Sequence, residues 1–182
     1  PWRALAASVA VAAVSASAAW ITRGAMDARH WQAVLATASP ERAAGGYAQR
    51  AAIAHAVYAP DMGRPVEVSA ENEKGLVTWL TKRMGAPMRA PSLTQAGYEL
   101  VGGRLLPGGA GPVALFMYGA ADGQRLTLYV TREAAGGQTA FQFTQEGPVR
   151  VFYWVEGQFG YALSGAVSRD ELQRVSQEVY KQ

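Results

Sequence analysis

Few residues of this chain have the type and spacing that catalysis or metal binding requires. The 182 residues include no cysteine and two histidines, which excludes disulfide bonds, thiolate metal sites, a cysteine nucleophile and a zinc site built from histidines alone. No serine stands in the Gly-x-Ser-x-Gly pattern of a hydrolase nucleophile. The glycine-rich stretch 102–111 lacks the Gly-Lys-Ser/Thr ending of a phosphate-binding loop, so we interpret it as a hairpin loop. We therefore expect no enzyme active site, no metal and no cofactor.

Four residues are candidates for a face that binds a signal or a partner: His55, Tyr58, Phe152 and Trp154. His55 stands between two alanines on the apolar side of a predicted helix, which favours a packed, hydrogen-bonded histidine over a ligand or a base. In a strand, the run 152–154 places Tyr153 on one face and its two aromatic neighbours on the other. Both burial under helices and a ligand- or partner-binding face are compatible with this pattern.

Composition predicts a folded chain without a nucleic-acid partner. Apolar residues make up 49% and charged residues 17%, a mixture too hydrophobic and too weakly charged for a disordered protein. The 17 Lys and Arg residues exceed the 14 Asp and Glu residues by only 3. Because these charges are scattered singly, they do not form the clustered basic stripe that nucleic-acid binding requires.

An uncharged segment, residues 4–21, stands near the start of the chain. As a helix with about 1.5 Å rise per residue it would be roughly 27 Å long, close to the ~30 Å hydrocarbon core of a bilayer. We favour a transmembrane helix, because residues that suit a membrane interface flank the segment: Trp2, Arg3, Trp20 and Arg23. A secretory signal peptide with a cleavage site at Ala16-Ser17-Ala18 and a buried alanine-rich helix are the alternatives.

A juxtamembrane connector is predicted at residues 22–46. Its apolar spacing is compatible with a short amphipathic helix, but we favour an ordinary surface linker. Ser39-Pro40 would end such a helix, because the proline ring disfavours a helical residue before it. Gly45-Gly46 then predicts a flexible joint before the folded part of the chain.

Residues 47–182 have the pattern of one α+β domain. The stretch 47–58 predicts a helix, because its apolar residues recur at helical spacing. A short β-branched edge strand is predicted at 65–68. Ser69 is a suitable N-cap for a second helix, whose apolar face runs to Met84 before a glycine and a proline end it.

From residue 97 onward the apolar pattern has the period of a β-strand. Strands are predicted at 98–106, 113–118, 125–132, 139–145, 149–155 and 159–165, with Glu156-Gly157-Gln158 as the last turn. Short links require antiparallel neighbours, which gives one antiparallel sheet, a meander of about five strands. A capping box from Ser168 to Glu171 begins a C-terminal helix. With helices before and after the strands, we expect the helices to cover one face of the sheet.

The chain from Tyr47 to its end resembles the transmembrane anti-sigma factors of proteobacteria, the group that partners extracytoplasmic-function sigma factors. Each shared motif is weak alone, but their order and spacing make the set specific, and residues 4–21 lie where such proteins have their membrane span. The motifs are Ala54-His55-Ala56-Val57-Tyr58, Pro65-Val66-Glu67-Val68, Trp79-Leu80-Thr81-Lys82-Arg83-Met84-Gly85, Leu100-Val101-Gly102-Gly103-Arg104-Leu105-Leu106-Pro107, Phe116-Met117-Tyr118, Arg125-Leu126-Thr127-Leu128-Tyr129, Phe152-Tyr153-Trp154 and Gly160-Tyr161-Ala162-Leu163-Ser164-Gly165.

The resemblance implies a non-enzymatic regulator that crosses the inner membrane once and carries its C-terminal domain in the periplasm. A cytoplasmic region absent from this chain would hold the sigma factor away from RNA polymerase until a signal leads to cleavage or rearrangement. The expected partners are therefore a sigma factor, the lipid bilayer and a periplasmic protein or protease.

Two positions depart from the family's pattern: Arg64 and Gly75 stand where histidine is usual in the family. If those histidines bind a metal or sense a signal in relatives, that role does not extend to this chain. The alternative function is a secreted or membrane-tethered module that binds a ligand or a protein on its aromatic sheet face.

Overall fold

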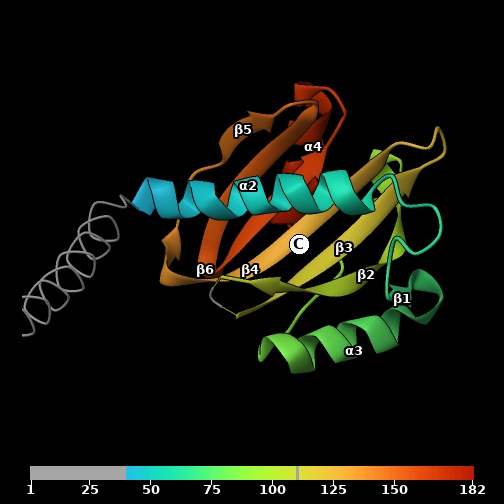
Figure 1. Ribbon diagram of the computed structural model, residues 1–182, viewed down its shortest axis with the longest axis horizontal. Coiled ribbons are helices and arrows are strands. Elements are labelled where there is room, and N and C mark those ends of the chain that lie inside the picture. Colours follow the sequence, from blue (N-terminus) through green and yellow to red (C-terminus); the bar gives the residue numbers. More distant parts are fainter. Residues whose placement is uncertain (1–39, 110) are drawn as a thin grey trace, which may run out of the picture. The chain divides into compact units, whose positions relative to one another are not determined.

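The computed structural model describes residues 40–109 and 111–182, and it has the α+β architecture that the sequence predicts (Figure 1). Residues 43–182 form one compact unit. The predicted membrane segment, 4–21, and the connector up to residue 39 lie outside the described residues. Within the described part of the chain, no helix is both long and apolar enough to cross a membrane.

One antiparallel sheet forms the centre of the fold, as the alternating pattern and the short links predict, but it has six strands and not about five. The spatial order is β1-β2-β3-β4-β6-β5, so the first four strands follow the predicted meander and the last two exchange places. The strands are β1 (Val68–Ser69), β2 (Tyr98–Gly108), β3 (Gly111–Ala120), β4 (Arg125–Gln138), β5 (Gln142–Glu146) and β6 (Val149–Gly165).

Strand β6 differs most from the prediction. Residues 156–158, which we expected to be a turn, lie inside one 17-residue strand. Gly157 has a φ of +60°, yet it pairs with Gly137 of β4, and Glu156 pairs with Gln138. The predicted turn is therefore wrong. The glycine permits a local irregularity without reversing the chain, because β4 continues beside it.

Helix α2 (Pro40–Tyr58) is longer than the helix predicted at 47–58. Pro40 is its first residue, a position that proline favours because the N–H there needs no helical partner. Gly45-Gly46 lies inside the helix, so the predicted flexible joint is wrong. Burial of the adjacent Tyr47 against the sheet opposes the cost of about 1 kcal/mol for each glycine in a helix interior.

The other helices begin and end close to the predicted cap residues, but the N-cap of the second predicted helix is Asn72 and not Ser69. Ser69 begins a short 3-10 turn, η1 (Ala70–Asn72), which leads into α3 (Glu73–Met84), and α3 ends at Gly85 with a φ of +67°. A second 3-10 turn, η2 (Thr94–Ala96), precedes β2. The Ser168 hydroxyl accepts a hydrogen bond from the Glu171 N–H at 3.2 Å, where α4 (Arg169–Tyr180) begins.

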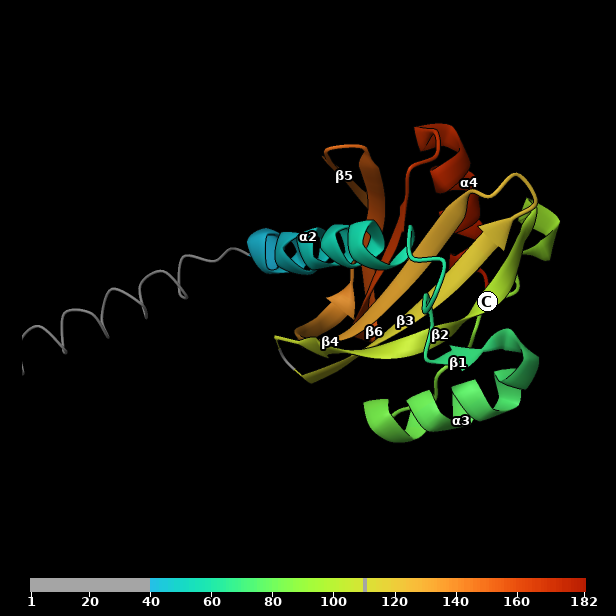
Figure 2. The ribbon, with the colours of Figure 1, turned by 45° about the vertical axis from the view of Figure 1, so that its right-hand side comes forward.

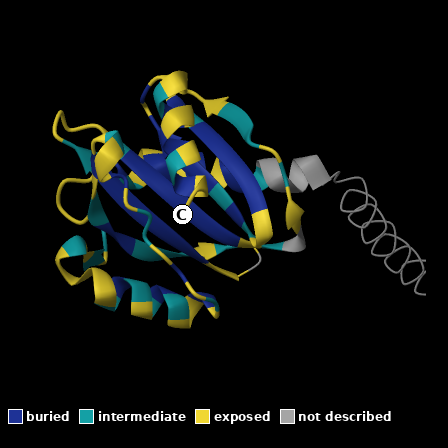
Figure 3. Ribbon diagram, turned by 180° about the vertical axis from the view of Figure 1, so that it is seen from behind, coloured by how far each residue is buried: buried dark blue, intermediate teal, exposed yellow. Residues whose placement is uncertain are grey.

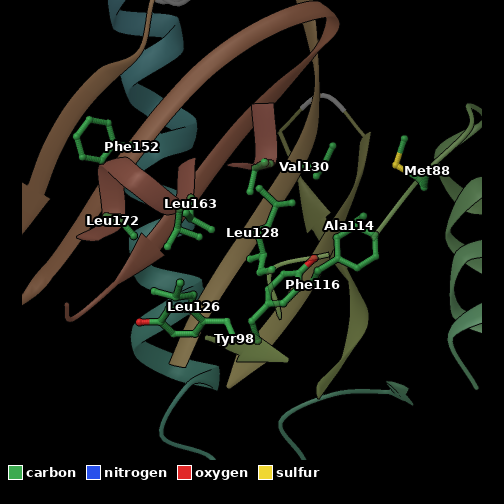
Figure 4. Packing of buried hydrophobic residues seen from close by; sticks show 14 of the residues in the cluster. Met88, Tyr98, Ala114, Phe116, Leu126, Leu128, Val130, Phe152, Leu163 and Leu172 are labelled. Carbon is green, nitrogen blue, oxygen red and sulfur yellow. The ribbon is translucent and has the colours of Figure 1, made fainter. Parts of the chain in front are cut away.

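Helices cover both faces of the sheet, whereas the sequence led us to expect one covered face. Helix α2 crosses one face (Figures 1 and 2), where Tyr47 packs near Val113 and Leu115. The sheet is seen from behind in Figure 3. Ala114 and Phe116 alternate with Val113 and Leu115 along β3 and pack in one cluster with residues of α3 and α4 on the other face (Figure 4). Strand β3 is buried without interruption from Val113 to Tyr118, so each face needs a cover.

Candidate functional site

A cavity of about 380 Å³ lies between strands β4 and β6, the end of α4 and the loop that follows α3. We call it the aromatic pocket. Its apolar lining consists of Pro87, Met88, Pro91, Leu128, Val130, Trp154, Tyr161 and Val179. Its polar lining includes Arg89, Glu156, Tyr180 and Gln182, all of them exposed. A concave apolar site with a few polar groups is the arrangement expected of a small-molecule site.

Two stacked rings form part of the pocket's lining. The rings of Trp154 and Tyr161 are nearly parallel, with an interplanar angle of 9° and centroids 5.4 Å apart. Tyr180 meets Trp154 edge-on at 6.3 Å. Trp154 is 1% exposed, and its indole Nε1 has no hydrogen-bond partner among the described residues. A buried indole N–H without an acceptor is unusual, because leaving a buried donor unpaired costs free energy.

The stack depends on the irregularity at Gly157. Trp154 and Tyr161 are seven residues apart, and in a regular strand an odd separation places two side chains on opposite faces. Here both pack on the face covered by α3 and α4, because the alternation changes between residues 155 and 161. A glycine inside a strand pattern is the one sequence signal for this change.

Helix α2 holds the same tryptophan from the other side of the sheet. The buried Tyr47 hydroxyl donates a hydrogen bond of 2.9 Å to the main-chain carbonyl of Trp154. Gly160 leaves room for the Tyr47 ring, because a Cβ there would lie 2.9 Å from it. Burial raises the pKa of Tyr47, so the hydroxyl keeps the proton it donates. Trp154 thus contacts α2 through its backbone and the aromatic pocket through its ring.

The loop after α3 is fastened to the end of α4. The Gln182 side-chain amide donates to the Ser92 carbonyl at 2.9 Å, and its Oε1 accepts from the Ser92 N–H at 2.9 Å. Arg89 reaches the Gln182 carbonyl at 3.4 Å, a long bond that leaves most of its guanidinium free for another partner. Burial, and to a smaller extent the nearby Glu156 carboxylate, raise the pKa of Tyr161.

The four residues singled out from the sequence do not share one face. Trp154 and Phe152 lie in the core beneath α4, where Phe152 packs against Phe143 with centroids 5.1 Å apart. His55 and Tyr58 belong to α2, on the other side of the sheet. Of the four, only Trp154 lines the aromatic pocket.

His55 is packed and hydrogen-bonded, as its apolar neighbours predict. The residue is 5% exposed, and its Nδ1 lies 3.0 Å from the hydroxyl oxygen of Thr127. Burial lowers the pKa of His55 to about 4, so the imidazole is neutral at neutral pH.

Tyr58 is half-buried, and the guanidinium of Arg104 lies over its ring at 3.8 Å from the centroid. Arg104 also approaches the Glu67 carboxylate, at 3.9 Å. Its Nε and Nη1 have no partner among the described residues.

Sequence reasoning missed most of the aromatic pocket. Tyr161 was assigned to a strand but not to a site, and Tyr180 and Gln182 stand in a region that carried only a helix signal. Arg89 follows a helix end and has no local pattern that marks it. The pocket depends on tertiary contacts between segments far apart in the chain, which spacing along the sequence does not report.

The two positions that depart from the family's pattern lie near the start of α3 and in the turn before β1. Gly75 follows the cap of α3, where its N–H donates to the Asn72 side chain at 3.1 Å. A Cβ at Gly75 would lie 2.4 Å from that side chain, so a histidine would displace the cap. Arg64 is exposed. Over the described residues, no group of three His, Cys, Asp or Glu side chains is placed to hold a metal ion.

Comparison with protein families, with curated proteins and with solved structures finds no match for this chain. The functional interpretation therefore depends on the residues of the chain itself.

Proposed function

We propose that residues 47–182 are the periplasmic sensory domain of a membrane-bound anti-sigma factor. In this proposal residues 4–21 cross the inner membrane, and a cytoplasmic region outside this chain holds an extracytoplasmic-function sigma factor. A signal received by the domain leads to cleavage or rearrangement that frees the sigma factor. The domain itself performs no catalysis.

What supports the proposal is that an ordered set of motifs in this chain resembles the pattern of proteobacterial anti-sigma factors. Several of these motifs occupy positions where this fold allows little variation. A Cβ at Gly102 would lie 2.2 Å from the Val68 carbonyl, and one at Gly103 would lie 2.9 Å from Leu76. Another motif ends with Gly85, whose left-handed conformation closes α3. These contacts explain why glycine stands at these positions of the motifs in this fold.

The aromatic pocket supplies a place for the signal in this proposal. Its lining includes the ring of Trp154, and the carbonyl of the same residue binds Tyr47 of α2. Helix α2 is the described element nearest in sequence to the predicted membrane segment. A ligand that moved Trp154 would therefore act on the helix that leads toward the membrane.

The pocket also favours the second candidate function, a secreted or membrane-tethered ligand-binding module. Both functions predict ligand binding, but only the regulator predicts a stable complex with a sigma factor. The two are separated by isolating the full-length protein from membranes and identifying what is bound to it. Recovery of a sigma factor at a stoichiometric level supports the regulator. Recovery of the membrane protein without any sigma factor would refute it.

The predicted topology has its own test, because the 182 residues contain no cysteine. Lys74→Cys introduces a single thiol on an exposed residue of α3. In cells with a permeabilised outer membrane, a membrane-impermeant maleimide should label this thiol without lysis. The same protein without the Lys74→Cys substitution serves as the control. Labelling that appears only after lysis would contradict a periplasmic domain.

A further inference from the structure

We propose that the aromatic pocket binds a small monocarboxylate with an apolar body, either an aromatic acid or a short fatty acid. The identification of this ligand with the physiological signal depends on the function proposed above, whereas the binding itself does not. Three features of the pocket lead to this chemical class: its apolar walls, its unpaired donor and the charges at its rim.

The walls require an apolar ligand body. Leu128, Val130 and Val179 are aliphatic and buried, and the stacked rings of Trp154 and Tyr161 add a flat aromatic surface. Such a surface accepts another ring or an alkyl chain by dispersion and by release of water. The volume, about 380 Å³, lies near the lower end of the range for ligand pockets, which favours one ring or a short chain over a larger molecule.

The unpaired donor requires an acceptor on the ligand. The indole Nε1–H of Trp154 can donate but cannot accept, and it is buried without a partner among the described residues. Nε1 is covered in this structure, so a ligand oxygen reaches it only after the surrounding side chains move, and accepting its proton would then remove the penalty of an unpaired buried donor. A purely hydrocarbon ligand would leave the penalty in place, so the pocket favours a ligand that carries oxygen.

The rim carries one charge of each sign, and Arg89 is the group there that can pair with a ligand carboxylate. Arg89 offers a guanidinium whose single hydrogen bond within the described residues, to the Gln182 carbonyl, is long. Guanidinium pairs with carboxylates at short distance and in a planar geometry. Glu156 lines the same pocket, and its carboxylate would repel a second negative charge on the ligand. A cationic amine would be repelled by the positively charged guanidinium of Arg89.

The test uses the full chain in lipid nanodiscs, with every tryptophan replaced by 5-fluorotryptophan. Fluorine NMR then reports each of the five indoles separately, and Trp154→Phe assigns the resonance of the pocket residue. The probes are 4-phenylbutyrate and octanoate, compared with 4-phenylbutanol and octylamine. We expect a saturable shift of the Trp154 resonance with both acids, and no shift of Trp79, which lies on α3 and does not line the pocket.

Two variants test the contacts separately. Arg89→Glu reverses the rim charge and should weaken binding of either acid by about tenfold, whereas Arg83→Glu, an exposed matched control in the last turn of α3, should leave it unchanged. Trp154→Phe keeps a ring but removes the donor, and isothermal titration calorimetry should show binding weakened by roughly two- to tenfold. Native circular dichroism of both variants excludes misfolding as the cause.

The outcomes separate the parts of the proposal. A Trp154 resonance that does not shift up to about 10 mM acid, the weak end of specific binding, would overturn the site. Equal affinity for 4-phenylbutanol or octylamine would overturn the assigned class. A response to only one of the two acids would keep the class and identify its source. Binding without recovery of a sigma factor would keep this inference and refute the proposed function, and the reverse result would do the opposite.

Discussion

The hydrogen bond between Tyr47 and Trp154 makes a sharp prediction about stability. Tyr47→Phe removes one hydroxyl and keeps the ring, which is fully buried and packs edge-on against Tyr153 at 5.8 Å. The Trp154 carbonyl then loses a donor at 2.9 Å in a site that water does not reach. Removing one partner of a buried hydrogen bond costs about 1–3 kcal/mol, so we expect a loss of about 2 kcal/mol in the free energy of unfolding.

Urea unfolding followed by far-ultraviolet circular dichroism measures this loss. The transition midpoint should fall while the slope with urea stays the same, because the surface exposed on unfolding does not change. In a thermal melt, the same loss should lower the midpoint by roughly 4–8 °C for a domain of this size.

Tyr58→Phe is the matched control, since it makes the same chemical change on the same helix. Tyr58 is half-buried, its hydroxyl has no hydrogen bond within the described residues, and the Arg104 contact involves the ring. Its substitution should cost less than about 0.5 kcal/mol. Equal urea midpoints for the two variants would show that the buried Tyr47 hydroxyl adds no more to the free energy of unfolding than the Tyr58 hydroxyl does. The inferred link between α2 and the pocket would then be wrong.

Two further predictions concern a buried histidine and two glycines. Burial lowers the pKa of His55 to about 4 in the folded chain, below the unfolded value of about 6.5, so the unfolded state binds more protons between these two pH values. The free energy of unfolding should therefore fall by about 2 kcal/mol from about pH 7 to about pH 4.5. Urea titrations should show a smaller fall in His55→Gln, and an equal fall would contradict the assignment. Gly103→Ala should destabilise the domain by about 1–3 kcal/mol, because the new Cβ would lie 2.9 Å from Leu76 and 3.0 Å from the Leu115 carbonyl. Gly46→Ala in α2, with its nearest neighbour at 3.6 Å, should instead stabilise the domain by about 0.5–1 kcal/mol. Calorimetry measures both midpoints: a lower midpoint for Gly46→Ala or a higher one for Gly103→Ala would contradict the corresponding assignment.

Local signals predicted the parts of the fold that local interactions determine. The cap residues Ser69 and Ser168 stand where η1 and α4 begin, and Gly85 ends α3, because each satisfies backbone groups within a few residues of itself. The alternating pattern also predicted the antiparallel sheet. These features depend on one short stretch of chain at a time.

The errors arise where a distant partner decides between two local options. Glycine within 156–158 is compatible with a turn or with an irregular strand, and only the presence of β4 alongside selects the strand. Gly45-Gly46 is compatible with a joint or with a helix, and packing of Tyr47 on the sheet favours the helix. A helix that precedes the strands can cover either face of the sheet, and the residues of β3 are apolar on both faces.

The candidate site was the least predictable part of the molecule. Trp154 was identified from the sequence as half of an aromatic pair with Phe152, but the structure separates their roles: Phe152 is core, and Trp154 lines the pocket together with Tyr161. That partnership exists because the side-chain alternation changes near Gly157. A rule that assumes regular alternation assigns Tyr161 to the wrong face.

The double attachment of Trp154 has a consequence for how such domains could diversify. A replacement at this position would disturb the helical layer on one side of the sheet and the ligand on the other, so selection has little freedom there. The loop residues Met88 and Arg89, and Val179 near the end of α4, have no comparable tie to the opposite layer. We therefore expect new ligand preferences to arise by substitutions at these three lining residues, while the tryptophan stays constant.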